Sequence, residues 1–184
     1  PAHTADQTIR VLTTLGIKET LPLLRQVFDK RPSPTRARQL YELGDERGLD
    51  FLKQQLAEER ATTRRTAARL LCELGIPEGA TTLLALLSTI PDAGNGQQKI
   101  SYSDLRAIEL YLAKASEAAA ERSSIFEFFL LQIEEANWQH TIFRAIEQES
   151  KTDFGYRAAR VLNDEAERKV AVARSVKAAR EWWT

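Results

Sequence analysis

Arginines recur six residues before each of three glycines in the first half of the chain, as Arg10, Arg38 and Arg69. Glu42 and Glu73 follow the second and third arginines by four residues, a spacing at which side chains meet on a helix. Because a guanidinium forms forked hydrogen bonds with carboxylates, this column predicts a polar strip that binds an acidic or mixed-charge segment of another protein. The alternative is a row of solvated ion pairs, each contributing only about 0.3–0.5 kcal/mol.

A second basic cluster comprises Arg60, Arg64 and Arg65. Its arginines could meet a phosphate, but Glu58 and Glu59 adjoin them and no aromatic residue is interleaved for stacking on bases. The formal net charge of the 184-residue chain is zero, which removes the long-range attraction that nucleic acids and acidic lipids rely on. These features disfavour nucleic acid or a membrane as the partner.

Residues suited to catalysis are few. The chain has two histidines, His3 and His140, and one cysteine, Cys72. No spacing of His, Cys and carboxylates suits zinc, and we expect Cys72 to pack at the edge of the core rather than to react. The sequence therefore predicts a protein that is not an enzyme and has no metal or cofactor. One cysteine, no secretory signal and no membrane-length apolar run predict a cytoplasmic location.

The arginine column belongs to a repeat in which a Leu-Gly pair closes one helical pattern and opens the next. The pairs end at Gly16, Gly44 and Gly75. Apolar or small residues stand one, four and seven positions before each glycine, so they share one helix face, which we expect to be core. These residues are Leu15, Leu12 and Ile9, then Leu43, Leu40 and Ala37, then Leu74, Leu71 and Ala68.

Each glycine supplies the left-handed conformation that ends a helix without a steric penalty from a Cβ atom. A second apolar stripe follows, so each unit is a pair of antiparallel helices. The pattern predicts an all-α fold, an α-α superhelix of the HEAT-like or armadillo type with about ten helices and no strand. Equivalent positions align in such a stack, and the second helices line its concave surface. There we place the strip of Arg10, Arg38, Glu42, Arg69 and Glu73.

We expect one domain, with regular repeats over 5–90, an inserted loop over 91–100 and divergent repeats over 101–184. The first six helices along the chain are predicted over 4–15, 18–29, 34–43, 46–58, 61–74 and 78–89. Capping boxes are predicted at Ser101 with Asp104 and at Ser124 with Glu127. A weaker repeat begins at Ala158, with Asn163-Asp164 in place of the glycine.

The segment over 63–87, TRRTAARLLCELGIPEGATTLLALL, resembles the short HEAT-like repeats of phycobilisome bilin lyases. In that family an arginine precedes paired alanines and an aspartate often follows the glycine. Here the aspartate is kept once, as Asp45. The matching residues are Arg64 or Arg65, Ala67, Ala68, Leu71, Leu74 and Gly75.

The resemblance implies a solenoid but not one activity, because such repeats occur in scaffolds, chaperones, lyases and DNA glycosylases. A protein-binding scaffold or adaptor is the function we expect. A bilin lyase or cofactor-delivery chaperone is the alternative, and DNA-lesion binding is a third.

The two ends of the chain suggest further contacts. Trp182 and Trp183 point about 100° apart on a helix, so we expect one to cap the last unit and the other to form a contact surface. Burial of both by a returning chain is the alternative.

An acidic stretch over 101–150 and a basic end suggest complementary surfaces for a partner or for another copy. Because the first unit lacks a cap, we expect a fragment or self-association through the solenoid ends.

Overall fold

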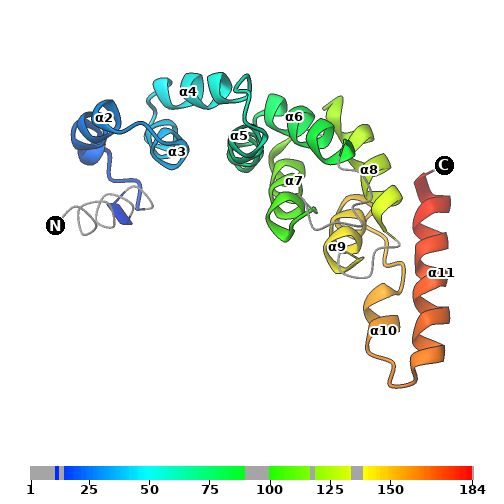
Figure 1. Cartoon of the computed structure of the whole chain (residues 1–184). Helices are drawn as coiled ribbons and strands as arrows, with labels where there is room; N and C mark the ends of the chain where they lie inside the picture. Colours follow the sequence, from blue (N-terminus) through cyan, green and yellow to red (C-terminus); the bar gives the residue numbers. More distant parts are fainter. Residues whose placement is uncertain (1–10, 13–14, 90–99, 117–118, 134–138, 184) are drawn as a thin grey trace.

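The computed structural model describes residues 11–12, 15–89, 100–116, 119–133 and 139–183. These residues form one 3-10 turn and ten α-helices and no β-strand, as the repeat predicts (Figure 1). The elements are η1 (Lys18–Thr20), α2 (Leu21–Lys30), α3 (Pro34–Glu42), α4 (Arg47–Gln55), α5 (Ala61–Leu74), α6 (Pro77–Ser88), α7 (Tyr102–Lys114), α8 (Glu121–Gln132), α9 (Gln139–Ser150), α10 (Tyr156–Arg160) and α11 (Glu165–Trp183).

The helices stack in two layers along an arc (Figure 1). Helices α3, α5, α7 and α9 pack against one another in that order on the inner, concave side. Helices α2, α4, α6 and α8 lie on the outer side, and α11 runs along the C-terminal end of the arc beside α10. The all-helical arrangement is compatible with the predicted solenoid, and the second helix of each unit lies on the inner side.

The three repeat glycines end their segments in the same way. Gly16, Gly44 and Gly75 have φ angles of 69°, 90° and 82°, in the left-handed region that glycine tolerates. The amide after each glycine donates to the carbonyl of the leucine four residues before that glycine. The N–O distances are 3.0 Å for Ile17 to Leu12, 2.9 Å for Asp45 to Leu40 and 2.9 Å for Ile76 to Leu71. This bond is the Schellman closure of a helix, so the sequence repeat is also a structural repeat.

Burial of the predicted core face follows the repeat except at its first copy and at Leu74, which is only half-buried. Leu40 and Leu71 are fully buried, whereas Leu12 is only half-buried. Leu15 is 67% exposed, so the prediction that it belongs to the core is wrong. The equivalent Leu43 is only 4% exposed and belongs to the first of the two core clusters, so the repeat pattern alone does not determine burial.

Small residues bring the two helices of a hairpin into backbone contact. A Cβ atom at Gly48 of α4 would lie 2.0 Å from the carbonyl oxygen of Ala37 on α3. A Cβ atom at Gly79 of α6 would lie 2.8 Å from the carbonyl oxygen of Ala68 on α5. Both glycines stand four residues after a capping glycine, a second element of the repeat that the sequence analysis missed.

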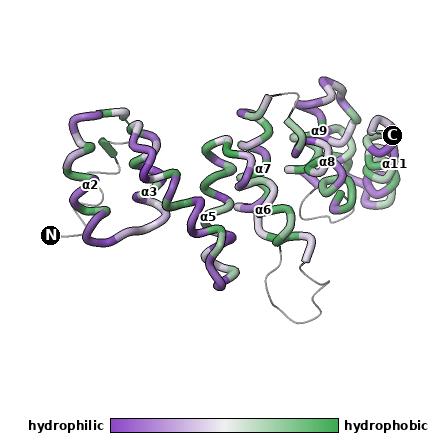
Figure 2. The backbone as a smooth tube through the Cα atoms, turned by 90° about the horizontal axis from the view of Figure 1, so that it is seen from above, coloured by the Kyte–Doolittle hydropathy of each residue, from purple (hydrophilic) through white to green (hydrophobic). Residues whose placement is uncertain are grey.

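The core divides into two clusters that meet at α5, where Leu71 belongs to the first and the adjacent Cys72 to the second. Polar and apolar residues alternate along the helices, so each helix can bury one side and expose the other (Figure 2). The first cluster is made mainly of leucine and alanine, whereas the second is rich in aromatic residues. Its fully or nearly fully buried rings are Tyr111, Phe126, Phe128, Phe129, Phe143 and Tyr156.

The two capping boxes predicted in the C-terminal half have different outcomes. The capping box of Ser101 and Asp104 is confirmed at the start of α7. The second predicted box is wrong, because α8 already begins at Glu121 and therefore contains both Ser124 and Glu127.

The predicted replacement of a glycine at Asn163-Asp164 is also wrong. Among the described residues only Lys151 has a positive φ angle without being glycine. Asp164 instead caps the next helix, since its Oδ1 accepts the amide of Glu167 at 2.8 Å. The predicted loop over 91–99 lies outside the described residues, as does most of the predicted helix over 4–15.

Candidate functional site on the inner helices

Arg38 of α3 links two successive inner helices. Its Nε donates to Oε1 of Glu42 at 2.7 Å, the pairing that the four-residue spacing predicts. Its Nη1 also pairs with Oε2 of Glu73 on α5. The side chains of Arg38 and Glu42 are each 35% exposed, and that of Glu73 is 27% exposed. Glu73 therefore pairs with the arginine of the preceding unit and not with its own neighbour Arg69.

Arg69 lies next along the inner side and keeps its hydrogen-bonding capacity. Its Nε is 3.9 Å from Oδ1 of Asp104 on α7, within range of charge attraction but too far for a hydrogen bond. It makes no hydrogen bond to any residue that the structure describes, and its side chain is 31% exposed. Arg10, the first member of the predicted column, lies outside the described residues.

Asp104 is the buried anchor of this row of charges. Its Oδ1 accepts from Nε of Arg65 at 3.0 Å, its Oδ2 pairs with Nη2 of the same arginine, and Ser101 donates to it from both backbone and hydroxyl. Burial opposes ionisation of this carboxyl, but the hydrogen bonds from Arg65 and Ser101 outweigh it and lower the pKa of Asp104. The sequence analysis recognised the cap but not the ion pair.

The row continues over α7, α9 and α10. Glu109 of α7 accepts from Arg106 at 2.7 Å and from Arg144 of α9 at 2.6 Å. Glu147 of α9 lies 3.7 Å from Arg157 of α10. We call the whole row the inner ladder; it comprises Arg38, Glu42, Arg65, Arg69, Glu73, Asp104, Arg106, Glu109, Arg144, Glu147 and Arg157. Each of α3, α5, α7 and α9 contributes both signs of charge to it, and ion pairs join neighbouring helices.

The predicted basic cluster does not converge on one point. Nη1 of Arg64 donates to the backbone carbonyls of Glu58 and Glu59, each at 2.8 Å. Arg65 instead points to Asp104 on α7. Arg60 is exposed at the start of α5. Two of the three guanidiniums are therefore held in structural contacts that face different parts of the molecule.

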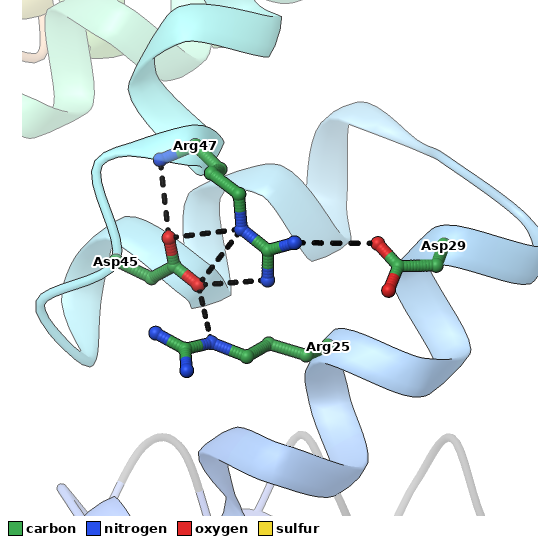
Figure 3. A network of polar contacts seen from close by, with 4 residues as sticks. All are labelled: Arg25, Asp29, Asp45 and Arg47. Carbon is green, nitrogen blue, oxygen red and sulfur yellow. Dashed lines mark hydrogen bonds and ion pairs between the residues drawn. The ribbon is translucent and has the colours of Figure 1, made fainter.

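Asp45, the aspartate that follows Gly44, is at the centre of a second polar network (Figure 3). Its carboxylate accepts from Nε of Arg25 at 2.7 Å and from Nη2 of Arg47 at 3.0 Å. Arg47 also reaches Asp29 at 3.5 Å. Hydrogen bonds from Arg47 lower the pKa of Asp45 to about 2, with burial opposing them and Arg25 adding to them. Because the carboxylate is only 6% exposed, this network joins α2 to α4 and offers no open site.

The terminal tryptophans both pack on the last outer helix. Phe126 of α8 has its ring centroid 6.1 Å from that of Trp182 and 5.4 Å from that of Trp183. Trp182 also lies 6.1 Å from Phe154 and remains 36% exposed, whereas Trp183 packs against the second core cluster. One ring is thus more covered than the other, and both attach α11 to α8.

The residues most suited to catalysis are poorly placed for it. Cys72 is fully buried rather than at the edge of the core, and burial raises the pKa of its thiol to about 12. The thiolate nucleophile is therefore negligible at neutral pH. His140 is exposed, and the pKa of its imidazole is lowered by partial burial and by Arg160 and Arg144.

No helix in the described part of the chain is long and apolar enough to cross a bilayer. Over the same residues no group of three or more His, Cys, Asp or Glu side chains could hold a metal ion.

Comparison with known proteins finds no match to a family model, to a curated protein or to a solved structure.

Proposed function

We propose that the protein is a scaffold that binds a mixed-charge segment of another protein along the inner ladder. The observation that carries this proposal is the partial exposure of Arg38 and Arg69 on successive inner helices. Each is about one-third exposed, and Arg69 has donors that no described residue uses. A partner carboxylate can bind there without breaking an existing hydrogen bond.

The charges around Arg69 favour a mixed-charge segment over a purely acidic one. Glu42, Glu73 and Asp104 lie beside the two arginines, so a run of acidic side chains would meet repulsion as well as attraction. A segment that carries both acidic and basic residues can pair with both signs of charge in the ladder. Partly exposed ion pairs contribute little to stability, which leaves them available for exchange with a partner.

We also propose that the units are HEAT-like repeats. This proposal is supported by the identical closure after Leu12, Leu40 and Leu71 and by the two-layer stack. The alternative of a bilin lyase requires a nucleophile if the pigment is attached through the protein itself, and the burial of Cys72 speaks against that route.

Binding of peptides tests the scaffold proposal. Peptides would be selected from a random displayed library on the wild-type protein and measured against it by fluorescence anisotropy. The double variant Arg38→Gln/Arg69→Gln should bind the selected mixed-charge peptides at least about tenfold more weakly, a change of about 1.4 kcal/mol. Arg174→Gln, an exposed arginine on α11, is the matched control and should leave affinity within about twofold.

The loss in the double variant must come from the surface and not from unfolding. Because the ion pairs of Arg38 and Arg69 are about one-third exposed, their loss should lower the free energy of unfolding by no more than about 1 kcal/mol. Unchanged peptide affinity in the double variant, with the fold intact, would reject the inner ladder as the binding surface.

A further inference from the structure

A groove opens at the C-terminal end of the arc, away from Arg38 and Arg69. It has a volume of about 710 Å³ and lies between the start of α9, α10 and α11. Its floor is apolar, with Tyr156 only 4% exposed and Val176 only 7% exposed, and Val172 beside them half-buried. We call it the end groove.

The groove exists because two neighbouring helices differ greatly in length. Helix α10 has five residues, whereas α11 has nineteen, so α10 covers only part of the side of α11 that faces it. Figure 1 shows α11 extending along and beyond the short α10. One side of α11 is therefore not covered by α10 over several turns.

The row of α11 residues that lines the groove is patterned like a docking surface for a helix. Arg168, Val172, Val176 and Arg180 follow one another at intervals of four residues and all line the groove. Residues at this spacing form one ridge on a helix. The ridge spans twelve residues, or about 18 Å at 1.5 Å per residue, the length of a short helical segment. Its middle is apolar and its two ends are basic.

The charge lining the groove is strongly positive. One acid, Glu181, lines it beside five bases, while the formal net charge of the whole chain is zero. Glu181 is 3.6 Å from Lys177 and Glu165 is 2.8 Å from Lys169, but both pairs are exposed and cancel little of this charge. No described carboxylate forms an ion pair with Arg160 or Arg168. The five bases are Arg160, Arg168, Lys169, Lys177 and Arg180.

The acidic stretch over 101–150 is poorly suited to fill the groove of a second copy. Asp104, Glu109 and Glu149 from this stretch are paired within the molecule, with Arg65, Arg144 and Arg122 respectively. We therefore take the complementary charge to come from another protein.

We propose that the end groove binds an acidic, amphipathic helical segment of another protein, with apolar side chains over Tyr156 and Val176 and carboxylates along the basic rim. Charge complementarity selects an acidic occupant, and the length of the ridge selects a helix over a small anion. The concave shape favours a helix over a flat membrane surface, because the apolar floor lies below the basic side chains. This site is separate from the inner ladder and does not depend on the function proposed for it.

A designed peptide tests the proposal on the full chain. The peptide would have about 14 residues, with leucines four apart flanked by glutamates, blocked termini and a fluorescent label. A control peptide would have the same composition in a shuffled order that destroys the apolar ridge. We expect saturable binding of the designed peptide, weakening as salt rises, and at least about tenfold weaker binding of the shuffled peptide.

Variants of α11 locate the binding. Lys169→Glu/Lys177→Glu should weaken binding of the designed peptide at least about tenfold, because both exposed lysines line the groove. Arg174→Glu is the matched control: Arg174 lies two residues from both Val172 and Val176, on the opposite side of α11, and should change affinity by less than about twofold. Should the double variant unfold, Lys169→Gln/Lys177→Gln provides the same comparison without charge reversal.

Three outcomes would overturn the proposal. They are equal binding of designed and shuffled peptides, an equal loss in Arg174→Glu, and failure of the designed peptide to bind while phosphatidylserine vesicles bind the protein. Arg69→Gln should leave this peptide's affinity unchanged, so failure of the end groove can be told apart from failure of the inner ladder.

Discussion

The two core clusters on either side of α5 show two ways of building the same two-layer stack. In the first, glycine and alanine bring the helices of a hairpin into backbone contact, as at Gly48 with Ala37, and leucines fill the remaining space. The second includes Ala68 at the equivalent contact with Gly79, but beyond that hairpin aromatic rings fill most of the space, as where Phe126 meets Trp183.

The difference in packing determines which surface each region can offer. Close, regular hairpins keep the inner helices in register, so their charged residues align into the inner ladder. Aromatic packing allows helices of unequal length, such as α10 and α11, and leaves the end groove open. The region around the first core cluster thus presents the repeated charges of the inner ladder, whereas the region around the second presents the end groove.

The largest effect should follow removal of a ring from the aromatic region. Phe126 is 1% exposed and touches the rings of Phe129, Trp182 and Trp183. Phe126→Ala should lower the free energy of unfolding by about 3–5 kcal/mol, measured by urea denaturation. Tryptophan emission should shift to longer wavelength as the indoles gain solvent.

Phe51, which is half-buried on α4 in the leucine-rich region, is the comparison for Phe126. Phe51→Ala should cost clearly less, because less of its ring is buried. Equal losses at the two positions would show that burial of the ring does not determine its contribution to stability.

The next largest loss of stability should follow the addition of a methyl group where α4 touches α3. A Cβ at Gly48 would lie 2.0 Å from a backbone oxygen, so Gly48→Ala must push α4 away from α3 and should cost about 3 kcal/mol. At Gly44 a Cβ meets no atom within 4 Å, and only the φ angle of 90° is unfavourable. Gly44→Ala should therefore cost about 1 kcal/mol. If thermal unfolding ranks these two variants in the opposite order, close backbone packing is not what holds the regular region together.

Acid should weaken the regular region through Asp45. The folded state lowers its pKa from 3.8 to about 2, so the carboxylate stabilises the fold above about pH 4. That contribution, about 2 kcal/mol, is lost as pH falls from about 4 to about 2. Asp45→Asn should lose this amount at pH 7 and less at pH 3, as urea titrations at both values would report. A variant as stable as the wild type at pH 7 would show that the network in Figure 3 is not stabilising.

The sequence was sufficient to predict the regular region because each unit is closed by local signals. Leu40 with Gly44 and Leu71 with Gly75 define both a helix end and a core face, so their structure follows from residues close in the chain. Leu15 follows the same pattern but is exposed, because burial depends on neighbouring units. Ser124 and Glu127 matched a helix-start signal inside a helix, which shows the limit of local patterns.

The candidate sites were predictable only in part. The pairing of Arg38 with Glu42 follows from spacing on one helix, but its pairing with Glu73 depends on how α3 packs on α5. The end groove had no sequence signal of its own, since it arises from the short length of α10. Contacts between helices distant in the chain are set by packing, and no local pattern encodes them.

A two-dimensional NMR titration of the nitrogen-15-labelled protein tests the central claim most directly. A peptide selected on the wild-type protein would be added while the backbone amides and the arginine Nε–H groups are followed. The account predicts shifts at the side chains of Arg38 and Arg69 and at the amides of α3 and α5, with little change in α4 and α6. Shifts confined to the outer helices, with Arg38 and Arg69 unaffected, would contradict it.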